Sequence, residues 1–510
     1  MLSAITSGVT RQGGCVSRVT CCLVVVGAFL GSAGAWAADP AVEEARGAYL
    51  AGVKFIEAGD YAAAVKAFTD VLARYPRFEE AYYGRGLAYA NSMQPALAIV
   101  DYTQAIKLNP KDKRYYVNRA AAYLHLESDD RARDAKEALR DCESALALDP
   151  DYYEAYFARA LARDRLGELD KSLEDYSHLL EKFPGNPQNK ETLANRGTVY
   201  NKLGQNDKEL QDYNAALALD PTHHGARFNR GAAFMDLGEY DKAIADFTRL
   251  IELRPDDAPA YGQRGLAYMR MREYKKAMAD IDKALALDPK SETARFNRAL
   301  VLSKLGRDAE SAEAFSKIIA LKPSDGQAYL SRGEAYERTG QMQAAAKDLD
   351  QAVLLDPKNP WSWATRGLFR FRRGEYDETS EDLVKALELK PDQMYWQAFL
   401  FLARERAGKD GKAKLSAFRK SRQTEEWPLP VIDMLLGTTS VTDCLSAAKD
   451  ANAEGDKEKK CEAFYFVGEL HILAGDRKQA AEFFGKCIDT GLSGFIGYEG
   501  AKAELERLGK

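Results

Sequence analysis

The sequence has few of the residues on which most enzyme and metal sites depend. Only five of its 510 residues are histidine, and none of the five has the spacing of a metal site or a catalytic pair. It contains no glycine-rich phosphate loop, no nucleophile elbow and no His-Glu-x-x-His helix. We therefore expect no enzymatic activity, no cofactor and no bound metal.

The chain also lacks a basic field and a low-complexity composition. Its formal charge is −5 with both signs spread along the chain, so we expect no nucleic acid partner. With 17 prolines, 46% hydrophobic and 29% charged residues, the composition is that of a folded protein. After residue 38 no stretch is apolar enough to cross a membrane.

The first 38 residues differ from everything that follows. Arg11 and Arg18 accompany an apolar stretch over residues 19–30, and Ala35-Trp36-Ala37 has the small-x-small pattern of a cleavage site. We predict a secretory signal peptide over residues 1–38 and export to the periplasm or cell envelope. The alternative is an uncleaved N-terminal anchor, because residues 19–38 are just long enough to span a bilayer, and only then do we expect membrane contact.

Export would place the remaining cysteines in an oxidising compartment. Cys142 falls at a core position of the repeat described below, whereas Cys444, Cys461 and Cys487 lie near the C-terminal end. A disulfide between Cys461 and Cys487 is our first choice, because it would tie two antiparallel helices together. The alternative is that these cysteines are unpaired, small apolar residues of a helical core.

Prolines recur along the chain at a nearly constant interval. The interval is 34 residues except for one of 40 and one of 37, and the positions are Pro76, Pro110, Pro150, Pro184, Pro221, Pro255, Pro289, Pro323, Pro357 and Pro391. Each proline follows an apolar helical segment such as Ala-Leu-Ala-Leu-Asp, which it ends. A fixed period of this size predicts an all-α solenoid of helical hairpins.

Other landmarks keep step when each proline is counted as position 32 of its repeat. Position 8 is small, as at Gly52 and Gly86, and position 11 is often aromatic, as at Tyr89. Position 15 is often glycine, which predicts the turn between the two helices of a hairpin. Position 20 is commonly alanine and position 24 commonly aromatic, as at Ala64 and Phe68. Small residues at 8 and 20 let the two helices approach, and large residues at 11 and 24 fill the space beside them.

These spacings resemble the tetratricopeptide repeat over residues 45–393, as ten repeats. The resemblance implies a right-handed superhelical solenoid in which each repeat buries its apolar face only by stacking on its neighbours. After Pro391 the pattern weakens, so residues 394–460 are assigned to a degenerate hairpin and a linker. Residues 461–510 restore the landmarks as a last hairpin and end in a charged capping helix.

Arginine stands at position 7 of nine repeats, where the family usually has an apolar residue, and aspartate at position 23 of eight. Pairing could lie within a repeat or between neighbouring repeats. Pairing within a repeat leaves only Arg298 without an acid, whereas pairing with the preceding repeat leaves several charges alone. We therefore predict an arginine ladder inside the hairpins, with a structural role.

The resemblance also implies that the first helix of each repeat lines a concave groove, with positions 5 and 13 facing inward. The predicted ligand-binding residues at position 5 are aromatic: Tyr83, Phe157, Phe228 and Phe296. Those at position 13 are basic: Arg165, Lys202, Arg270, Lys304, Arg338 and Arg372. An apolar floor beside a basic row suits an extended peptide or an amphipathic helix that carries acidic residues. The alternative is that these are ordinary packing residues and solvated helix-end charges.

The last part of the chain, residues 425–510, resembles the NlpI-type lipoproteins of the bacterial envelope. The resemblance rests on Trp427-Pro428, on the run Cys461 to Gly468 and on the ending Phe495-Ile496-Gly497-Tyr498. It implies an exported adaptor that docks cell-wall hydrolases and other envelope proteins. Two features depart from that family: the lipid-attachment cysteine is absent and this array is far longer.

The sequence thus predicts a non-catalytic scaffold of the bacterial cell envelope that binds protein or peptide ligands in its groove. The alternatives are a glycan-binding or accessory factor for cell-wall enzymes, in which groove aromatics stack on sugars, and a hydrolase hidden in residues 394–460.

Overall fold

The computed structural model describes residues 40–424, 426–450, 452–492 and 495–510. The predicted signal peptide lies outside these residues. Over the described ranges the chain forms α-helices and no strand, which confirms the predicted all-α class. No helix among them is both long and apolar enough to cross a membrane. The chain divides into two compact modules: the N-terminal module ends at Glu273, and the C-terminal module runs from Tyr274 to Lys510.

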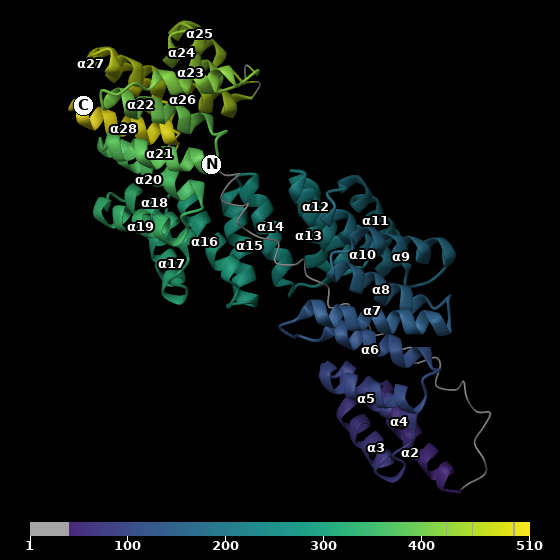
Figure 1. Cartoon of the computed structure of the whole chain (residues 1–510). Helices are drawn as coiled ribbons and strands as arrows, with labels where there is room; N and C mark the ends of the chain where they lie inside the picture. The colour runs from purple at the N-terminus through teal and green to yellow at the C-terminus, as the bar shows by residue number, and fades with distance from the viewer. Residues whose placement is uncertain (1–39, 425, 451, 493–494) are drawn as a thin grey trace. The chain divides into compact units, whose positions relative to one another are not determined.

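Each module is a stack of antiparallel hairpins (Figure 1), and most repeats consist of a first helix of 13 residues and a second of 14. The N-terminal module contains α2 (Pro40–Glu57), α3 (Tyr61–Arg74), α4 (Glu79–Asn91), α5 (Pro95–Leu108), α6 (Lys113–His125), α7 (Arg131–Leu148), α8 (Tyr153–Arg165), α9 (Leu169–Lys182), α10 (Asn189–Lys202), α11 (Asn206–Leu219), α12 (His224–Asp236), α13 (Tyr240–Leu253) and α14 (Ala258–Arg270).

The C-terminal module begins with stacked hairpins of its own and ends in a cap. Its helices are α15 (Tyr274–Leu287), α16 (Glu292–Lys304), α17 (Asp308–Leu321), α18 (Gly326–Arg338), α19 (Met342–Leu355), α20 (Pro360–Arg373), α21 (Tyr376–Leu389), α22 (Met394–Arg406), α23 (Lys412–Lys420), α24 (Leu429–Leu436), α25 (Val441–Ala447), α26 (Ala453–Leu473), α27 (Arg477–Ile488) and α28 (Ile496–Leu508).

The turn inside each hairpin of the ten-repeat array, except that of the third repeat, contains one left-handed residue at position 15. Gly59, Gly238 and Gly374 adopt φ values of 75°, 75° and 82°, a conformation that glycine reaches without a steric penalty. Met93 and Arg272 occupy the same position at φ 61°, so the fold imposes this geometry even where the residue opposes it. The predicted role of position 15 is thus confirmed.

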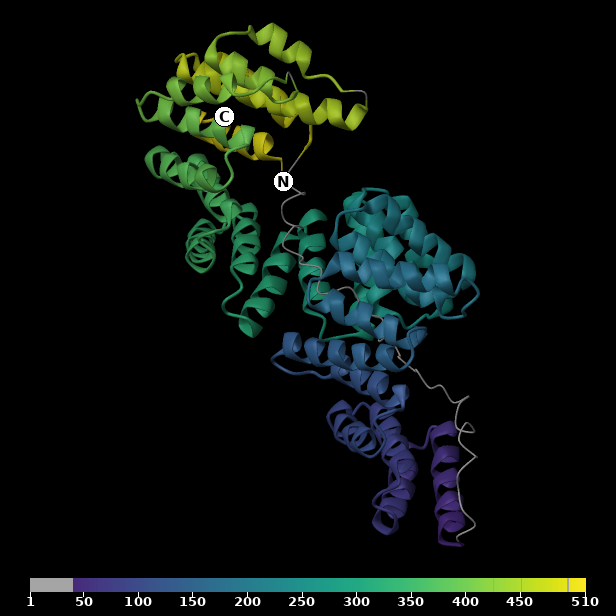
Figure 2. The same cartoon turned by 45° about the vertical axis from the view of Figure 1, so that its right-hand side comes forward.

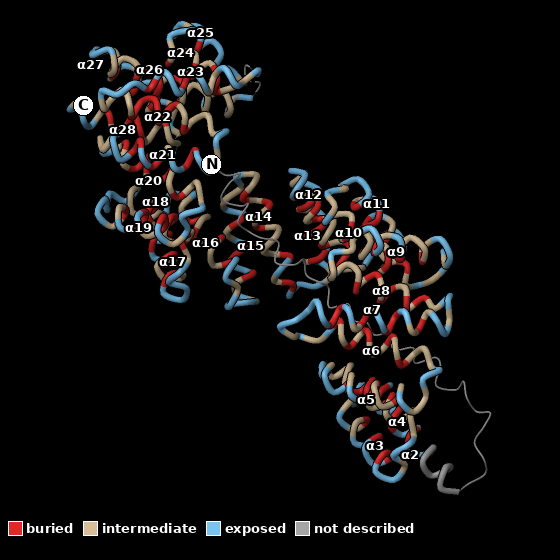
Figure 3. Tube along the Cα trace, in the orientation of Figure 1, coloured by how far each residue is buried: buried red, intermediate tan, exposed pale blue. Residues whose placement is uncertain are grey.

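Small and aromatic landmarks meet inside the hairpins, and buried residues follow the lines where helices touch (Figure 3). A Cβ added to Gly86 would lie 2.6 Å from Cε1 of Tyr102, and one added to Gly52 would lie 2.7 Å from the ring of Phe68. Both rings are fully buried. Cys142 takes the ring's position in its own repeat and is also fully buried, as the sequence predicts.

The end of the C-terminal module is a compact cap with one shared core. The segment that the sequence analysis assigns to a linker contains the short helices α24 and α25, and α26 begins before Cys461, at Ala453. Leu429, Ile432 and Cys444 of these helices are fully buried in the core that also holds α22, α26 and α27. The last helix, α28, folds back against α20, α26 and α27, as both views show (Figures 1 and 2).

Candidate functional site: the inner face of the repeats

Within each module, the first helices of the repeats form one continuous face. Successive first helices such as α4 and α6, α10 and α12, or α18 and α20 touch each other. Among the described residues, successive second helices make at most marginal contact with one another. Elements that touch lie on the inside of a curved stack, so the first helices line its inner face and the second helices its outer face.

The aromatic residues predicted to form the floor of this face are mostly part of the core. Tyr83, Phe157 and Phe228 are only 5%, 6% and 8% exposed, whereas Phe296 is partly exposed. Each ring packs against the position-24 ring of its own repeat at a centroid distance of 5.3–5.9 Å: Tyr83 on Tyr102, Phe157 on Tyr176, Phe228 on Phe247 and Phe296 on Phe315. They therefore brace each hairpin, and the first three offer a ligand little more than ring edges.

The basic residues predicted at position 13 end the first helices, and several are bound to the preceding repeat. Lys202 Nζ lies 2.6 Å from Asp164 Oδ1, and Arg338 Nε lies 2.8 Å from Asp308 Oδ1. Arg372 makes two bonds of 2.7 and 2.8 Å to the carboxylate of Glu337. Arg270 and Lys304 are the last residues of α14 and α16, and Arg165 is the last residue of α8.

These ion pairs set the charge available on the inner face. Burial opposes the positive charge of Arg372, but the charge and hydrogen bonds of Glu337, together with the nearby Tyr465 and Glu499, hold the pKa of Arg372 above its ordinary value. Because the pairs join neighbouring repeats, they also fix how one first helix lies on the next. The basic row is therefore partly neutralised within the protein, which the sequence analysis did not foresee.

The arginine ladder forms inside the hairpins as predicted. Nε and Nη2 of the arginine make paired bonds of 2.6–3.0 Å to both oxygens of the position-23 aspartate, and the pairs are Arg85–Asp101, Arg119–Asp141, Arg159–Asp175, Arg196–Asp212, Arg230–Asp246, Arg332–Asp348 and Arg366–Asp382. The remaining predicted pair, Arg264 with Asp280, falls on either side of the division between the modules.

Eight of the nine arginines, all but Arg159, also reach the preceding repeat, a contact that the sequence did not predict. The acceptor is the polar side chain at position 25, at 2.7–3.1 Å, in the pairs Arg85–Thr69, Arg119–Thr103, Arg196–Ser177, Arg230–Asn214, Arg264–Thr248, Arg298–Asp282, Arg332–Ser316 and Arg366–Asp350. Arg298 is therefore not the orphan that we expected, because Asp282 replaces the missing acid. The recurrence of threonine, serine, asparagine or aspartate at position 25 was the available signal.

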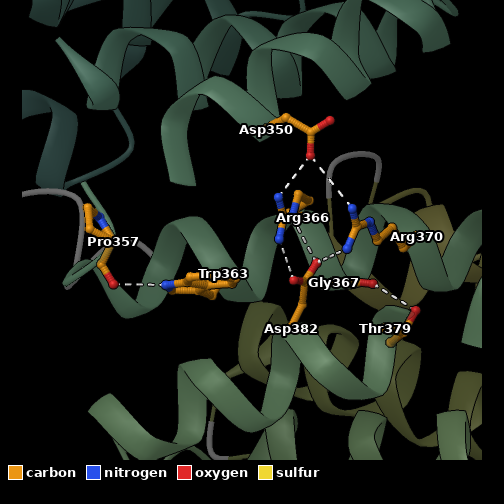
Figure 4. Close-up of polar contacts among 8 residues, drawn as sticks. All are labelled: Asp350, Pro357, Trp363, Arg366, Gly367, Arg370, Thr379 and Asp382. Carbon is orange, nitrogen blue, oxygen red and sulfur yellow. Dashed lines mark hydrogen bonds and ion pairs between the residues drawn. The ribbon is translucent and has the colours of Figure 1, made fainter. Parts of the chain in front are cut away.

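Figure 4 shows this arrangement in the tenth repeat. Arg366 bonds both oxygens of Asp382 and, at 2.8 Å, Asp350 of the preceding repeat. The guanidinium lies over the ring of Trp363, whose indole N–H donates to the carbonyl of Pro357 at 2.9 Å. The proline that ends one repeat is thus linked through position 4 to the arginine of the next.

The cap contains a buried charged cluster, also absent from the sequence analysis. Arg406 Nη2 lies 2.8 Å from Glu469 and 2.9 Å from Glu504, and both carboxylates are almost completely buried. Burial raises the pKa of Glu469 to about 7, against the opposing charge of Arg406. Arg507 of α28 bonds Glu504 and donates to the carbonyl of Phe371 at 3.1 Å, so the cluster fastens the last helix to α20.

Cys461 and Cys487 lie next to each other on the antiparallel helices α26 and α27. Their Sγ atoms are 3.3 Å apart, both are fully buried, and both are free thiols in this structure. Cys444, also buried, is likewise free. The disulfide stays a prediction for the oxidised protein.

The adjacent histidines His223 and His224, at the start of α12, both have local hydrogen-bond partners. His223 Nδ1 accepts the amide N–H of Ala226 at 3.0 Å and caps α12, while His224 bonds Asp257. No group of side chains in the described part of the chain has the composition of a metal site.

The fold and this inner face define a class: a solenoid of helical hairpins, the architecture of a protein-interaction scaffold and typically a non-catalytic one. Sequence models of the tetratricopeptide repeat match residues 48–77, 79–112, 130–187, 195–258, 240–301 and 304–360, together more than half of the chain. The chain therefore belongs to the tetratricopeptide repeat family, which confirms the resemblance.

Known relatives match parts of the array. The chain is 37% identical over 91 residues to Hsp70-Hsp90 organizing protein 2 of Arabidopsis thaliana, and 39% identical over 85 residues to small glutamine-rich tetratricopeptide repeat-containing protein 2 of Saccharomyces cerevisiae. These matches cover 18% and 17% of this chain, and only 15% and 23% of the two relatives. A tetratricopeptide repeat protein from Parabacteroides merdae shares 27% identity at a TM-score of 0.43, covering 49% of this chain and 98% of its own.

Proposed function

We propose that this protein is an exported, non-catalytic scaffold of the bacterial cell envelope that holds protein or peptide ligands on its inner face. The repeat architecture supports the scaffold role. The pattern of residues 1–38 supports export, and the resemblance of residues 425–510 to NlpI-type lipoproteins supports an envelope location. Cell-wall hydrolases are the class of partner that this resemblance brings forward.

One observation carries the proposal: exposed cations stand at the ends of the first helices beside partly exposed apolar residues. In the C-terminal module, Lys304 ends α16 and is exposed, and Phe296 on the same helix is partly exposed. A ligand with apolar anchors and acidic residues complements this surface, because its apolar groups leave water while its charges meet cations.

The geometry disfavours the alternative of a glycan-binding groove. Sugar rings stack on the open face of an aromatic side chain, and Tyr83, Phe157 and Phe228 are buried in the core. Parallel pull-downs with peptidoglycan fragments and with envelope proteins compare the two functions directly. Retention by glycan alone would favour the alternative.

The binding test combines Lys304→Glu with Phe296→Leu in the full chain. Phe228 is a poor target, because it is almost fully buried and its removal would cost roughly 3–5 kcal/mol of stability. The matched control is Lys317→Glu on the outer helix α17, where the side chain is 75% exposed. We expect the double variant to lose crosslinked partners, identified by mass spectrometry, and the control to keep them, with unchanged helical circular dichroism in both. Equal capture by both would rule out this groove assignment.

Export has its own test. We expect the protein recovered from the periplasm to begin near Asp39, as measured by its intact mass. A full-length mass in the membrane fraction would instead show an uncleaved anchor.

A further inference from the structure

Among the described residues, the position-13 cation Arg165 differs from its equivalents because it forms no direct ion pair. Lys202, Arg338, Arg372 and Arg406 at position 13 all form ion pairs. Arg165 holds the same position at the end of α8, is exposed, and forms no ion pair or side-chain hydrogen bond within the described residues.

The reason lies in the preceding repeat. Lys202 and Arg372 pair with the position-12 acids Asp164 and Glu337. The residue at position 12 before Arg165 is Leu124, which is buried and offers no charge. The third repeat also carries the longest interval of the array, and its extra residues place Arg131 at the start of α7.

Two further cationic side chains share this edge with Arg165. His125 ends α6, the first helix that packs beside α8, and Arg131 follows it across the turn. Both are exposed, and Arg131 makes no ion pair within the described residues. We define these three residues as the His125–Arg165 edge.

The acids nearest this edge have other partners. Asp134 bonds Ser128 and Arg133, and Asp164 bonds Lys202. Asp130 accepts the amide N–H of Arg133 and caps α7. Glu127 and Asp129 of the same turn stand within ion-pair distance of neither arginine.

The electrostatic consequence is consistent with a positive edge that Asp164 and Asp134 offset only in part, because their effect on the pKa of Arg165 is weaker. Desolvation by the neighbouring helix ends and the charge of Arg131 lower the pKa of Arg165, and desolvation and Arg165 lower the pKa of His125. In contrast, the carboxylate of Asp101 raises the pKa of Arg85 in the arginine ladder. A bound anion would therefore stabilise the charged forms of the side chains at this edge.

We propose that the His125–Arg165 edge binds a carboxylate-rich segment of a protein partner. Two guanidinium groups on neighbouring helix ends suit successive aspartate or glutamate side chains, because each arginine can donate two parallel N–H bonds to one carboxylate. This inference rests on the proposed scaffold function and names the chemistry of its partner in the N-terminal module.

The test uses the mature full chain and a fluorescein-labelled hexaglutamate peptide, with anisotropy as the readout at low ionic strength. We expect Arg165→Gln and Arg131→Gln each to weaken binding by about tenfold, the effect of losing one charge-assisted contact. The matched control is Arg140→Gln, whose side chain is 71% exposed on the outer helix α7. Hexalysine serves as the charge control and is expected not to bind.

The His125 side chain supplies a second, site-specific readout. A bound carboxylate stabilises the protonated imidazole, so saturation with hexaglutamate raises the pKa of His125, measured by NMR titration of its ring protons. Equal affinity of the wild type and Arg165→Gln, or an unchanged His125 pKa at saturation, overturns the inference. If hexaglutamate fails but crosslinking at the inner face still captures partners, the inference alone fails; if it binds but no protein is captured, the scaffold proposal fails instead.

Discussion

At the scale of single residues, the position-7 arginine organises the array because it bonds in two directions. In the ninth repeat Arg332 reaches Asp348 in its own hairpin at 2.6 and 2.9 Å, and Ser316 in the preceding repeat at 2.9 Å. The rings of Tyr329 and Tyr336 flank the same guanidinium, each 5.5 Å away. One side chain therefore sets both the hairpin geometry and the stacking of neighbours.

Arg332→Ala should destabilise the C-terminal module. It leaves Asp348, only 6% exposed, without its counter-charge, at a cost of about 2–3 kcal/mol. Hydrogen exchange of the α18 and α19 amides measures this loss. Arg307→Ala is the control, because its ion pair with Glu310 is exposed and should contribute nothing measurable. Similar losses in both variants would contradict the role given to the ladder.

The sequence predicted the arginine–aspartate pairs inside the hairpins but not the bonds between neighbouring repeats. The pairing of positions 7 and 23 was visible because both keep one residue type through most repeats. Position 25 varies among threonine, serine, asparagine and aspartate, and its partner lies in the next repeat, so the signal for the inter-repeat bond is a class of short polar residues and weaker than one fixed residue type. Likewise, a basic residue at position 13 does not reveal that Asp164 or Glu337 neutralises it.

At the scale of elements, the hairpins and their turns followed from the repeat, whereas the cap did not. Where period and landmarks are strong, each helix formed where expected. Residues 421–452 lack the period, and α24 and α25 form there because Leu429, Ile432 and Cys444 are buried against α22, α26 and α27. Such packing depends on tertiary neighbours that no local pattern reports.

The docking of α28 onto the cap depends on a close approach at Gly500. A Cβ there would lie 2.5 Å from Cε2 of the fully buried Tyr465, so Gly500→Ala should lower stability by about 1–3 kcal/mol. Gly485 on α27 has open space around it, and Gly485→Ala should instead raise stability by about 0.5–1 kcal/mol. Thermal unfolding of both variants checks the prediction. The same sign of change in the two would contradict this packing.

The buried cluster makes the cap sensitive to pH. The pKa of Glu469 is about 7 in the folded protein and 4.5 as the ordinary value. Because the pKa of Glu469 is higher in the folded protein, the protonated carboxyl group stabilises the fold. This stabilisation is fully present below the ordinary pKa and is lost as the pH rises through the folded pKa. Between about pH 5 and pH 8, hydrogen exchange of the α26 amides should therefore accelerate more than the pH dependence of the intrinsic exchange rate explains.

Two variants test whether Glu469 is the group responsible for this pH dependence. Glu469→Gln should flatten the pH dependence of α26 opening, because the amide cannot ionise. Glu482→Gln on α27 should leave it unchanged, because that exposed carboxylate pairs with Lys486 outside the cluster. A wild-type slope retained in Glu469→Gln would show that another group titrates.

At the scale of the whole molecule, the repeat predicted the architecture and the family, but it left the ligand open. The ligand-binding role of the apolar and basic residues at positions 5 and 13 stays a prediction. The structure shows that Tyr83, Phe157 and Phe228 are buried in the core. It also shows that part of the basic row forms ion pairs within the protein. The exposed side chains at position 13, such as Lys304 and Arg165, are the ones that we propose contact a partner.

Site-specific photocrosslinking in the full chain tests the central claim most directly. One photoreactive residue replaces Lys304 at the end of the first helix α16, and the other replaces Lys317 on the second helix α17, where the side chain is 75% exposed. If the inner face holds protein partners, Lys304 yields discrete covalent adducts, identified by mass spectrometry, and Lys317 yields none. Adducts of equal yield and identity at both positions, or only at Lys317, would contradict the account.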